Sequence, residues 1–275
     1  MGDAIGCERC AFGRYFPSLK SHFLTHFRHL LSSLLLLLFV LSFSTSFAFS
    51  FAVIGDKQYG DNIHKLLLNK INSDPEISFI VNTGDFALTG QQKDYDNYLK
   101  IIKTSNVPVY QVIGNHDAVY GGWKIFKKVF GPSYYSFNHE NSHFVVLDNA
   151  FKNSFDKRQF DWLVGDLKAN KQKHTFIFFH KPTFDATNTY PDHTMDSRYW
   201  IEKMMATFKK YNVDYVFSGH IHGYGKAERN GIIYIITGGG GAHLHLPNYL
   251  GGFYHYVKIT VDEDTISDKV VRLDD

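Results

Sequence analysis

The chain has 275 residues, of which 44% are hydrophobic and 20% are charged, so it is long and apolar enough to bury the core of one globular domain. Its formal net charge is +2, and residues 1–48, with four basic and two acidic side chains, account for all of it. Residues 49–275 are therefore neutral overall, which argues against a nucleic-acid partner. Both cysteines, Cys7 and Cys10, precede residue 49, so any metal ligands after that point must be nitrogen and oxygen donors.

The amino-terminal segment has the pattern of an export signal. Its basic residues come first, at Arg9, Arg14, Lys20 and Arg28. The apolar run Leu34–Leu41 follows, and Ser46-Phe47-Ala48 fits a small-x-small cleavage site. We predict that residues 1–48 are a secretory signal peptide and that residues 49–275 are a periplasmic or secreted domain. The alternative is an uncleaved anchor over residues 30–49, which approaches the ~20 residues of a spanning helix and would make the membrane a partner.

Short apolar runs alternate with helical patterns in the first part of this domain. The predicted strands are Phe51–Ile54, Ile77–Val81 and Val109–Ile113, and helices are predicted over residues 63–72 and 92–103. In the first helix the apolar period places Leu66 and Leu67 on the buried face. Strands that alternate with helices in this order predict an α/β fold with a parallel sheet.

The second part predicts a more mixed topology. A helix over residues 123–130 leads into an antiparallel hairpin of Tyr134–Phe137 and His143–Leu147, with a longer loop between them. Helices over 155–169 and 197–211, strands over 175–179 and 213–217, and a hairpin that turns at Asn230-Gly231 follow, before closing strands over 254–261 and 265–271. We expect the polar stretch Thr183–Asp196 to be a substrate-facing lid.

Five of the predicted strands end in side chains that bind metals or transfer protons. They are Asp56 with Gln58, Asp85, Asn115 with His116 and Asp117, His180, and His220 with His222. An aspartate after a strand is ordinarily a helix cap, so no single position identifies a site. Five together favour one, because the carboxyl ends of strands in an α/β fold share an edge where sites are built.

The same motifs resemble those of the calcineurin-like metallophosphoesterase superfamily. The similarity rests on Gly84-Asp85, Gly114-Asn115-His116-Asp117, His180 after an apolar strand, and Gly219-His220-Ile221-His222, and it covers about residues 51–271. It implies a four-layer α/β/β/α sandwich with mixed sheets. It also implies a dinuclear centre, in which two divalent ions bind phosphate oxygens and convert a water into hydroxide.

Carried over residue by residue, the resemblance divides the site residues between two metal ions. One ion would be held by Asp56, Asp85 and His222, with Gln58 nearby. The other would be held by Asp85 as a bridge, together with Asn115, His180 and His220. His116 would protonate the leaving oxygen as general acid, which suits a group that titrates near neutrality, and Asp117 would orient His116 or its loop.

Gln58 departs from the superfamily pattern, which has histidine at this position. An amide oxygen favours Mn²⁺ over Zn²⁺, with iron and zinc as the alternatives. Asp56-Lys57-Gln58-Tyr59 is similar to the first motif of Mn-dependent ADP-ribose/CDP-alcohol diphosphatases. Residues 130–137 and 238–242 instead resemble purple acid phosphatases, although Leu88 stands where that branch has its tyrosine ligand. Both branches therefore stay open.

The predicted function is hydrolysis of a small phosphoester by metal-bound hydroxide in an exported enzyme. A phosphodiesterase or nucleotide diphosphatase with the same centre is the alternative, followed by a decayed domain that binds phosphate ligands without turnover. Expected substrate contacts are Asn115, His116, Lys181, Tyr224 and His243. His245, two positions after His243, has the same potential to reach a phosphate or a metal.

Overall fold

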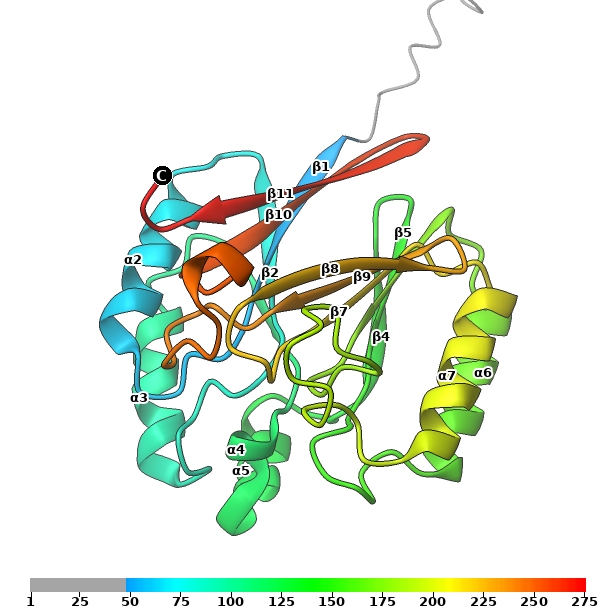
Figure 1. Ribbon diagram of the computed structural model, residues 1–275, viewed down its shortest axis with the longest axis horizontal. Helices are drawn as coiled ribbons and strands as arrows, with labels where there is room; N and C mark the ends of the chain where they lie inside the picture. Colours follow the sequence, from blue (N-terminus) through cyan, green and yellow to red (C-terminus); the bar gives the residue numbers. More distant parts are fainter. Residues whose placement is uncertain (1–47) are drawn as a thin grey trace, which may run out of the picture. The chain divides into compact units, whose positions relative to one another are not determined.

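The computed structural model describes residues 48–275, which contain two β-sheets (Figure 1). The first sheet has the order β11-β10-β1-β2-β3. Its strands are β1 (Phe49–Ile54), β2 (Ile77–Asn82), β3 (Val109–Gln111), β10 (His255–Asp262) and β11 (Thr265–Arg272). β1, β2 and β3 run parallel, as the alternating pattern predicts. β10 pairs antiparallel with β1, and β11 pairs antiparallel with β10.

The second sheet has the order β4-β5-β6-β7-β9-β8. Its strands are β4 (Tyr135–His139), β5 (Ser142–Val146), β6 (His174–Phe178), β7 (Tyr215–Ser218), β8 (Tyr224–Arg229) and β9 (Ile232–Thr237). β5, β6, β7 and β9 are parallel, and β4 and β8 close the two edges as antiparallel hairpin partners. Both sheets are therefore mixed, which confirms the predicted fold class.

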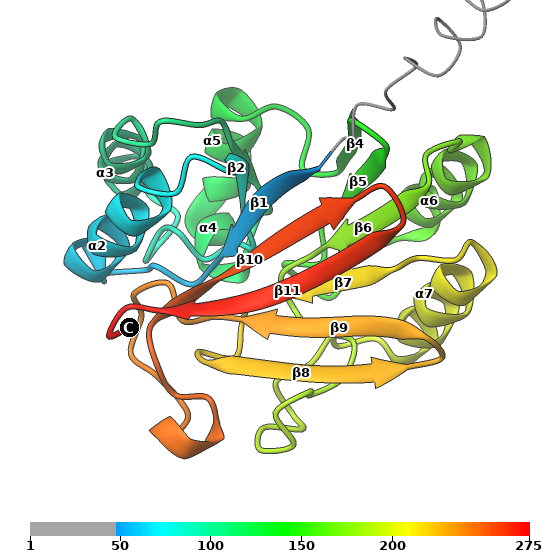
Figure 2. The ribbon, with the colours of Figure 1, turned by 90° about the horizontal axis from the view of Figure 1, so that it is seen from above.

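Helices cover the outer faces of the two sheets. α2 (Asp61–Asn72) and α3 (Gln92–Ile102) lie on one side, and α6 (Lys157–Ala169) and α7 (Arg198–Lys210) lie on the other (Figure 2). Between β3 and β4 come α4 (Asn115–Ala118), the 3₁₀ turn η1 (Val119–Gly121) and α5 (Gly122–Val129), and a second 3₁₀ turn, η2 (Asn248–Leu250), precedes β10. α2, α3, α6 and α7 bury apolar side chains against the neighbouring sheet.

The interior between the sheets is built mainly from phenylalanine. Phe51 of β1 is fully buried and stacks on Phe79 of β2 with the ring centroids 5.2 Å apart. Its ring also meets Phe144 of β5 and Phe176 of β6 edge-on, at 5.2 and 5.1 Å. Aromatic pairs in these geometries add stabilisation beyond the burial of their area. Side chains from both sheets thus interlock, which fixes the sheets against each other.

Three local expectations differ from the structure. The first hairpin has only Glu140 and Asn141 between its strands, because Glu140 takes the left-handed backbone conformation that a two-residue turn requires. β3 ends at Gln111, and the short helix α4 begins at Asn115. Leu66 of α2 is 51% exposed, whereas Leu68 and His64 are buried, so the buried face is rotated from the predicted one.

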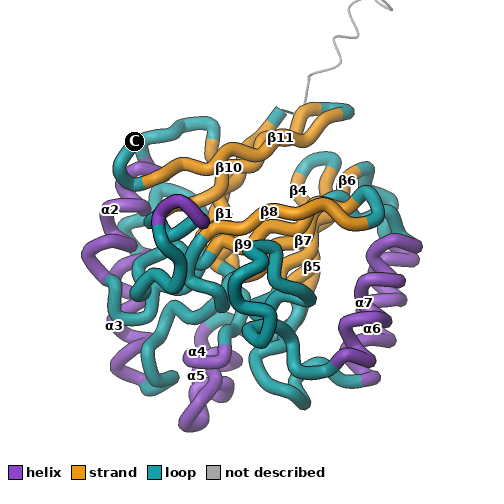
Figure 3. Tube along the Cα trace, viewed as in Figure 1, coloured by secondary structure: helices purple, strands orange, loops and turns teal. Residues whose placement is uncertain are grey.

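Apart from Ala48 and Phe49, the predicted signal peptide or anchor lies outside the described residues. Within residues 48–275, no helix is both long enough and apolar enough to cross a membrane. Loops gather at one edge of the two sheets, where β1, β2, β6 and β7 end (Figure 3). Most of the predicted metal ligands belong to these loops, and Asn115 is the first residue of α4.

Candidate metal centre

The two sheets deliver the predicted ligands to one edge. β1 ends before Asp56, β2 before Asp85, β6 before His180, and β7 before His220 and His222. The chain after β3 brings Asn115 to the same place as the first residue of α4. Asp56, Asp85 and His180 are almost completely buried. The expectation that these strand ends share one edge therefore matches their positions.

Asp56, Asp85 and His222 form one group of possible metal ligands. One ligand atom from each lies within 4.8 Å of the other two. His222 Nε2 is 3.5 Å from Asp56 Oδ1, and Gln58 Nε2 is 3.4 Å from His222 Nε2. The amide of Gln58 thus lies beside this group, as the resemblance implies.

Asp85, His180 and His220 form the second group, with the same limit of 4.8 Å. His180 Nε2 lies 3.3 Å from Asp85 Oδ2, 3.2 Å from His220 Nδ1 and 3.1 Å from Asn115 Oδ1. Asp85 belongs to both groups. A carboxylate has two oxygens, so Asp85 is the residue able to bridge two ions.

The backbone is unusual at four of these positions. Asp56, Gln58, Asp85 and His220 have φ angles of 61°, 43°, 54° and 70°, in the left-handed region that residues other than glycine rarely adopt. Two glycines also leave room for the carboxylates, because a Cβ on Gly114 would collide with Asp85 Oδ1 and one on Gly219 with Asp56 Oδ2. Backbone strain of this kind gathers at functional sites, where the surrounding fold holds it in place.

Backbone carbonyls orient two of the imidazoles. His180 Nδ1 is 2.9 Å from the carbonyl oxygen of Thr83, and His222 Nδ1 is 2.7 Å from that of His243. A carbonyl only accepts hydrogen bonds, so Nδ1 must carry the proton in both rings. Each Nε2 faces its group as a free lone pair when the ring is neutral, which is the form that binds a metal.

The charges of this edge are those of a cation site. Burial, reinforced by the charge of Asp85, raises the pKa of Asp56. Burial would also raise the pKa of Asp85, but the charge and hydrogen bond of His180 outweigh it and lower the pKa. Burial opposes the charge of His180, yet Asp85 raises the pKa of that ring to about 9. Within residues 48–275, neither carboxylate has a lysine or arginine within 4 Å.

The other two histidines are neutral. Burial and the charge of His180 lower the pKa of His220 to about 2, and burial and the neighbouring His245 lower that of His222 to about 4. Two buried carboxylates and uncharged imidazoles offer hard oxygen and borderline nitrogen donors together. The residues present therefore fit a pair of divalent ions.

His116 and Asp117 have different surroundings. His116 donates its backbone N–H to Asp85 Oδ1 at 2.9 Å, and its ring Nδ1 lies 2.7 Å from the carbonyl oxygen of Leu88. The carboxylate of Asp117 instead accepts the backbone N–H groups of Asp85, Ala87 and Gly114 at 2.7 to 2.8 Å. Burial raises the pKa of Asp117 to about 7. Asp117 is predicted to orient either His116 or its loop. Its contacts are with the backbone, so they fit the second role.

Comparison with known proteins agrees with this geometry. The sequence profile of the calcineurin-like phosphoesterase family matches residues 49–224, which is more than half of the chain. The chain belongs to the calcineurin-like phosphoesterase family. The predicted superfamily and the assignment to a family of phosphoesterase hydrolases are therefore confirmed, and the family depends on dinuclear metal centres.

Individual relatives come from two branches of this phosphoesterase family. A 3′,5′-cyclic-nucleotide phosphodiesterase of Nostoc sp. is 24% identical over 166 residues, which are 58% of this chain and 62% of the relative. Purple acid phosphatase 13 of Arabidopsis thaliana is 30% identical over 167 residues, 50% of this chain and 30% of the relative. The match thus spans less than two thirds of each relative.

A solved structure supports the fold. The purple acid phosphatase PPD1 of yellow lupin aligns with a TM-score of 0.69 and 16% identity, over 84% of this chain and 52% of the lupin chain. At this identity the likeness shows the fold alone.

Three of the predicted substrate contacts lie in different surroundings. Lys181 Nζ is 3.0 Å from Asp196 Oδ2, so its charge is already paired. The ring of Tyr224 packs in the core against Phe253 and His255. The side chain of His243 is exposed, and its backbone carbonyl is the group that meets His222.

Two further histidines lie at the candidate metal centre. The ring of His245 stacks on that of His222 with centroids 4.0 Å apart, and His193 lies 6.0 Å from His220. Tyr190 joins His193 to His245, since its ring contacts both and its hydroxyl donates to the His245 carbonyl. The sequence does not distinguish His243 from His245, because the glycine-rich loop before them has no regular periodicity that would show which side chain faces the site. His193 carries no signal beyond its place in the expected lid.

Proposed function

We propose that this chain is an exported phosphoesterase that hydrolyses a small phosphate ester at the edge where Asp56, Asp85, Asn115, His180, His220 and His222 meet. The observation that carries the proposal is the sharing of Asp85 between two ligand groups, each within 4.8 Å, at one buried edge. Independent surface residues would not bury two carboxylates together without cations.

Asp56, Asp85 and His222, with Gln58, would hold one ion, and Asp85, Asn115, His180 and His220 the other. When bound, two divalent ions polarise the phosphoryl group and supply a nucleophile at neutral pH. The amide oxygens of Gln58 and Asn115, next to two carboxylates, favour Mn²⁺, with iron and zinc as alternatives.

His116 would protonate the leaving oxygen. Its ring Nδ1 is committed to the Leu88 carbonyl at 2.7 Å, so Nε2 is the nitrogen that can exchange a proton with a substrate. The backbone hydrogen bond from His116 to Asp85 ties the acid to the presumed bridging ligand. Asp117 would hold the two segments together, because its carboxylate accepts the backbone N–H groups of Asp85 and Gly114.

A diester is the second candidate substrate. It is favoured by the phosphodiesterase from Nostoc sp., whereas the purple acid phosphatase favours a monoester. Comparing hydrolysis of bis-p-nitrophenyl phosphate and p-nitrophenyl phosphate by the full chain with Mn²⁺ separates the two.

The activity test uses Asp85→Asn, which keeps the shape but removes the shared charge. We expect kcat/KM to fall by more than about 10³-fold, because a buried ligand of both ions is lost. Asp161→Asn, an exposed position on α6, is the matched control. Activity of Asp85→Asn within tenfold of the unchanged protein would contradict the proposed centre.

The acid is tested with His116→Gln. Removing a general acid should reduce the rate of hydrolysis strongly for an alkyl phosphate, because its leaving oxygen needs a proton. The reduction should be small for a nitrophenyl phosphate, because its leaving group does not need one. An equal fall in rate for the two substrates would show that His116 is not the general acid.

Export is proposed from the pattern in residues 1–48 alone. Mass spectrometry of the protein recovered from the medium or periplasm should give an amino terminus at about Phe49. An intact terminus in a membrane fraction would favour the anchor instead.

A further inference from the structure

A pocket of about 760 Å³ lies beside the metal centre, between α5 and the loop that follows β5. Ile113 and Ala118 line it, and the segment between them contains Asn115 and His116. None of the predicted metal ligands lines the pocket. Its volume is within the ~300–1,000 Å³ that small-molecule sites occupy. It is therefore a neighbouring site with its own lining.

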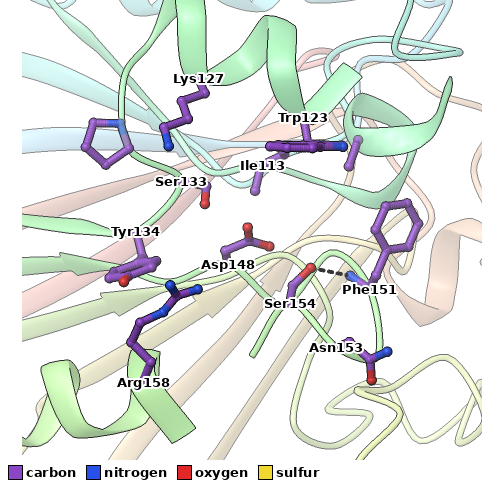
Figure 4. Close-up of a pocket in the computed structure, with 12 residues that line it drawn as sticks. Ile113, Trp123, Lys127, Ser133, Tyr134, Asp148, Phe151, Asn153, Ser154 and Arg158 are labelled. Atoms are coloured by element: carbon purple, nitrogen blue, oxygen red, sulfur yellow. Dashed lines mark hydrogen bonds between the residues drawn. The ribbon is translucent and has the colours of Figure 1, made fainter. Parts of the chain in front are cut away.

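Two of the three aromatic side chains that line this pocket, those of Trp123 and Phe151, lie at one end of it. Trp123 and Phe151 are 52% and 42% exposed, and Figure 4 shows both on the same side of the pocket. Large aromatic side chains exposed together around a concave surface are typical of a binding site for an apolar or planar group. An indole face in particular can stack on a flat heterocycle.

Cationic groups lie at the other end. Figure 4 shows Lys127 reaching in from α5 and Arg158 from α6, on either side of Tyr134. The nearest carboxylate to Arg158 is that of Asp156, at 3.8 Å on an exposed surface, and no described acidic group forms an ion pair with Lys127. Such exposed pairs contribute little, so both cations are available to an anion.

Asp148 lies between the two ends, as Figure 4 shows. Its carboxylate accepts from the Ala150 N–H at 3.2 Å and interacts with the hydroxyls of Ser133 and Ser154. A carboxylate offers about four lone pairs, so three partners leave capacity for a further donor. Its backbone N–H, bonded to Gln159 Oε1 at 2.8 Å, holds it in place.

We propose that this pocket binds a nucleoside monophosphate whose base carries an amino group. The base lies against Trp123, its amino group donates to Asp148, and the phosphate pairs with Lys127 and Arg158. Two cations against one carboxylate match an anionic ligand, and the aromatic end matches a planar base. The site is separate from the proposed hydrolytic centre and does not depend on turnover there.

Calorimetric titration of the full chain with adenosine monophosphate tests the proposal. The Asp85→Asn background prevents hydrolysis, and saturable binding of one equivalent is expected. Arg158→Gln should weaken it about tenfold, the effect of losing one charge-assisted hydrogen bond. Lys168→Gln removes a charge from the same helix outside the pocket and should bind normally. Trp123→Ala should also weaken binding about tenfold, with Tyr199→Ala, an exposed aromatic on α7, as its control.

Asp148→Asn tests how the base is read. An amide can donate where the carboxylate only accepts, so this variant should change the preference from adenosine to inosine monophosphate, which presents a carbonyl in place of the amino group. Absence of saturable binding would overturn the proposal. So would equal affinity for inorganic phosphate alone, or unchanged binding by both Arg158→Gln and Trp123→Ala. In the unsubstituted background the pocket variants should hydrolyse bis-p-nitrophenyl phosphate normally, which separates this site from the proposed function.

Discussion

The space between the two sheets and the edge where their strands end are built from the same strands but on opposite principles. Between the sheets, Phe51, Phe79 and Phe144 are buried against one another in ordinary extended backbone. A few residues further along the same chain, Asp56 and Asp85 are equally buried but carry ionisable carboxyl groups, and their backbone is left-handed. The interior between the sheets stabilises the fold. That stability holds the buried carboxyl groups of the edge close together, in a strained backbone, although burial and repulsion favour their separation.

This contrast predicts that damage to the interior costs stability and damage to the edge costs activity. Phe51→Ala should lower the free energy of unfolding by about 3–5 kcal/mol, because it leaves a cavity where Phe79, Phe144 and Phe176 meet. Urea denaturation measures the change, with Phe51→Leu as the milder control. Hydrolysis per folded molecule should stay within about twofold, since no predicted ligand is touched. A larger loss of activity than of stability would break the contrast.

Acid should expose a second weakness, at buried imidazoles outside the ligand groups. Burial lowers the pKa of His64 to about 4, below its ordinary 6.5, so between these values the unfolded chain binds more protons than the folded one. The free energy of unfolding should therefore decline by about 3 kcal/mol as the pH falls from 6.5 to 4.

The variant His64→Asn isolates this contribution. An asparagine amide can replace the donor to the Gly240 carbonyl, which His64 Nδ1 meets at 2.9 Å, but it does not titrate. Denaturation at pH 7 and pH 5 should show a weaker pH dependence in the variant. His139→Asn is the control, because that ring is only partly buried. An unchanged pH dependence would show that His64 is not the group responsible.

Gln58→His sharpens the comparison within the edge itself. The Gln58 amide lies 3.4 Å from His222 Nε2, so an imidazole there would add a nitrogen donor to that group. We expect affinity for Zn²⁺ relative to Mn²⁺ to rise about tenfold. Competition with a chromogenic chelator measures the ratio, and Gln92→His at an exposed helix position is the control. No change in the ratio would place Gln58 outside the coordination sphere.

The smallest effect is expected at Leu66. The apolar period predicts it on the buried face of α2, but the side chain is 51% exposed. Leu66→Ser should change the free energy of unfolding by less than about 0.5 kcal/mol beyond the helix-propensity difference. Leu67→Ser, at a fully buried neighbour, should be severely destabilising. Similar midpoints for the two variants would contradict the observed orientation of α2.

Much of the architecture was readable from the chain because its cues are local. Apolar runs bounded by polar turns marked the strands within one to three residues at most ends, and Asn230-Gly231 marked the turn between β8 and β9. The strand-end motifs pointed to Asp56, Asp85, Asn115, His180, His220 and His222 for the same reason. Each lies within four residues of the end of the strand that positions it.

Tertiary structure decided what depends on two distant segments at once. Only the packing of α2 against its sheet shows that Leu68 rather than Leu66 is buried, since both fit a helical stripe. Only the folded loops show that the ring of His245 stacks on that of His222 while the His243 side chain is exposed. The ion pair between Lys181 and Asp196 is likewise seen only in the folded chain. Residue types and spacing therefore predicted the chemistry of the edge. The identity of the groups around it depends on long-range contacts that no local pattern encodes.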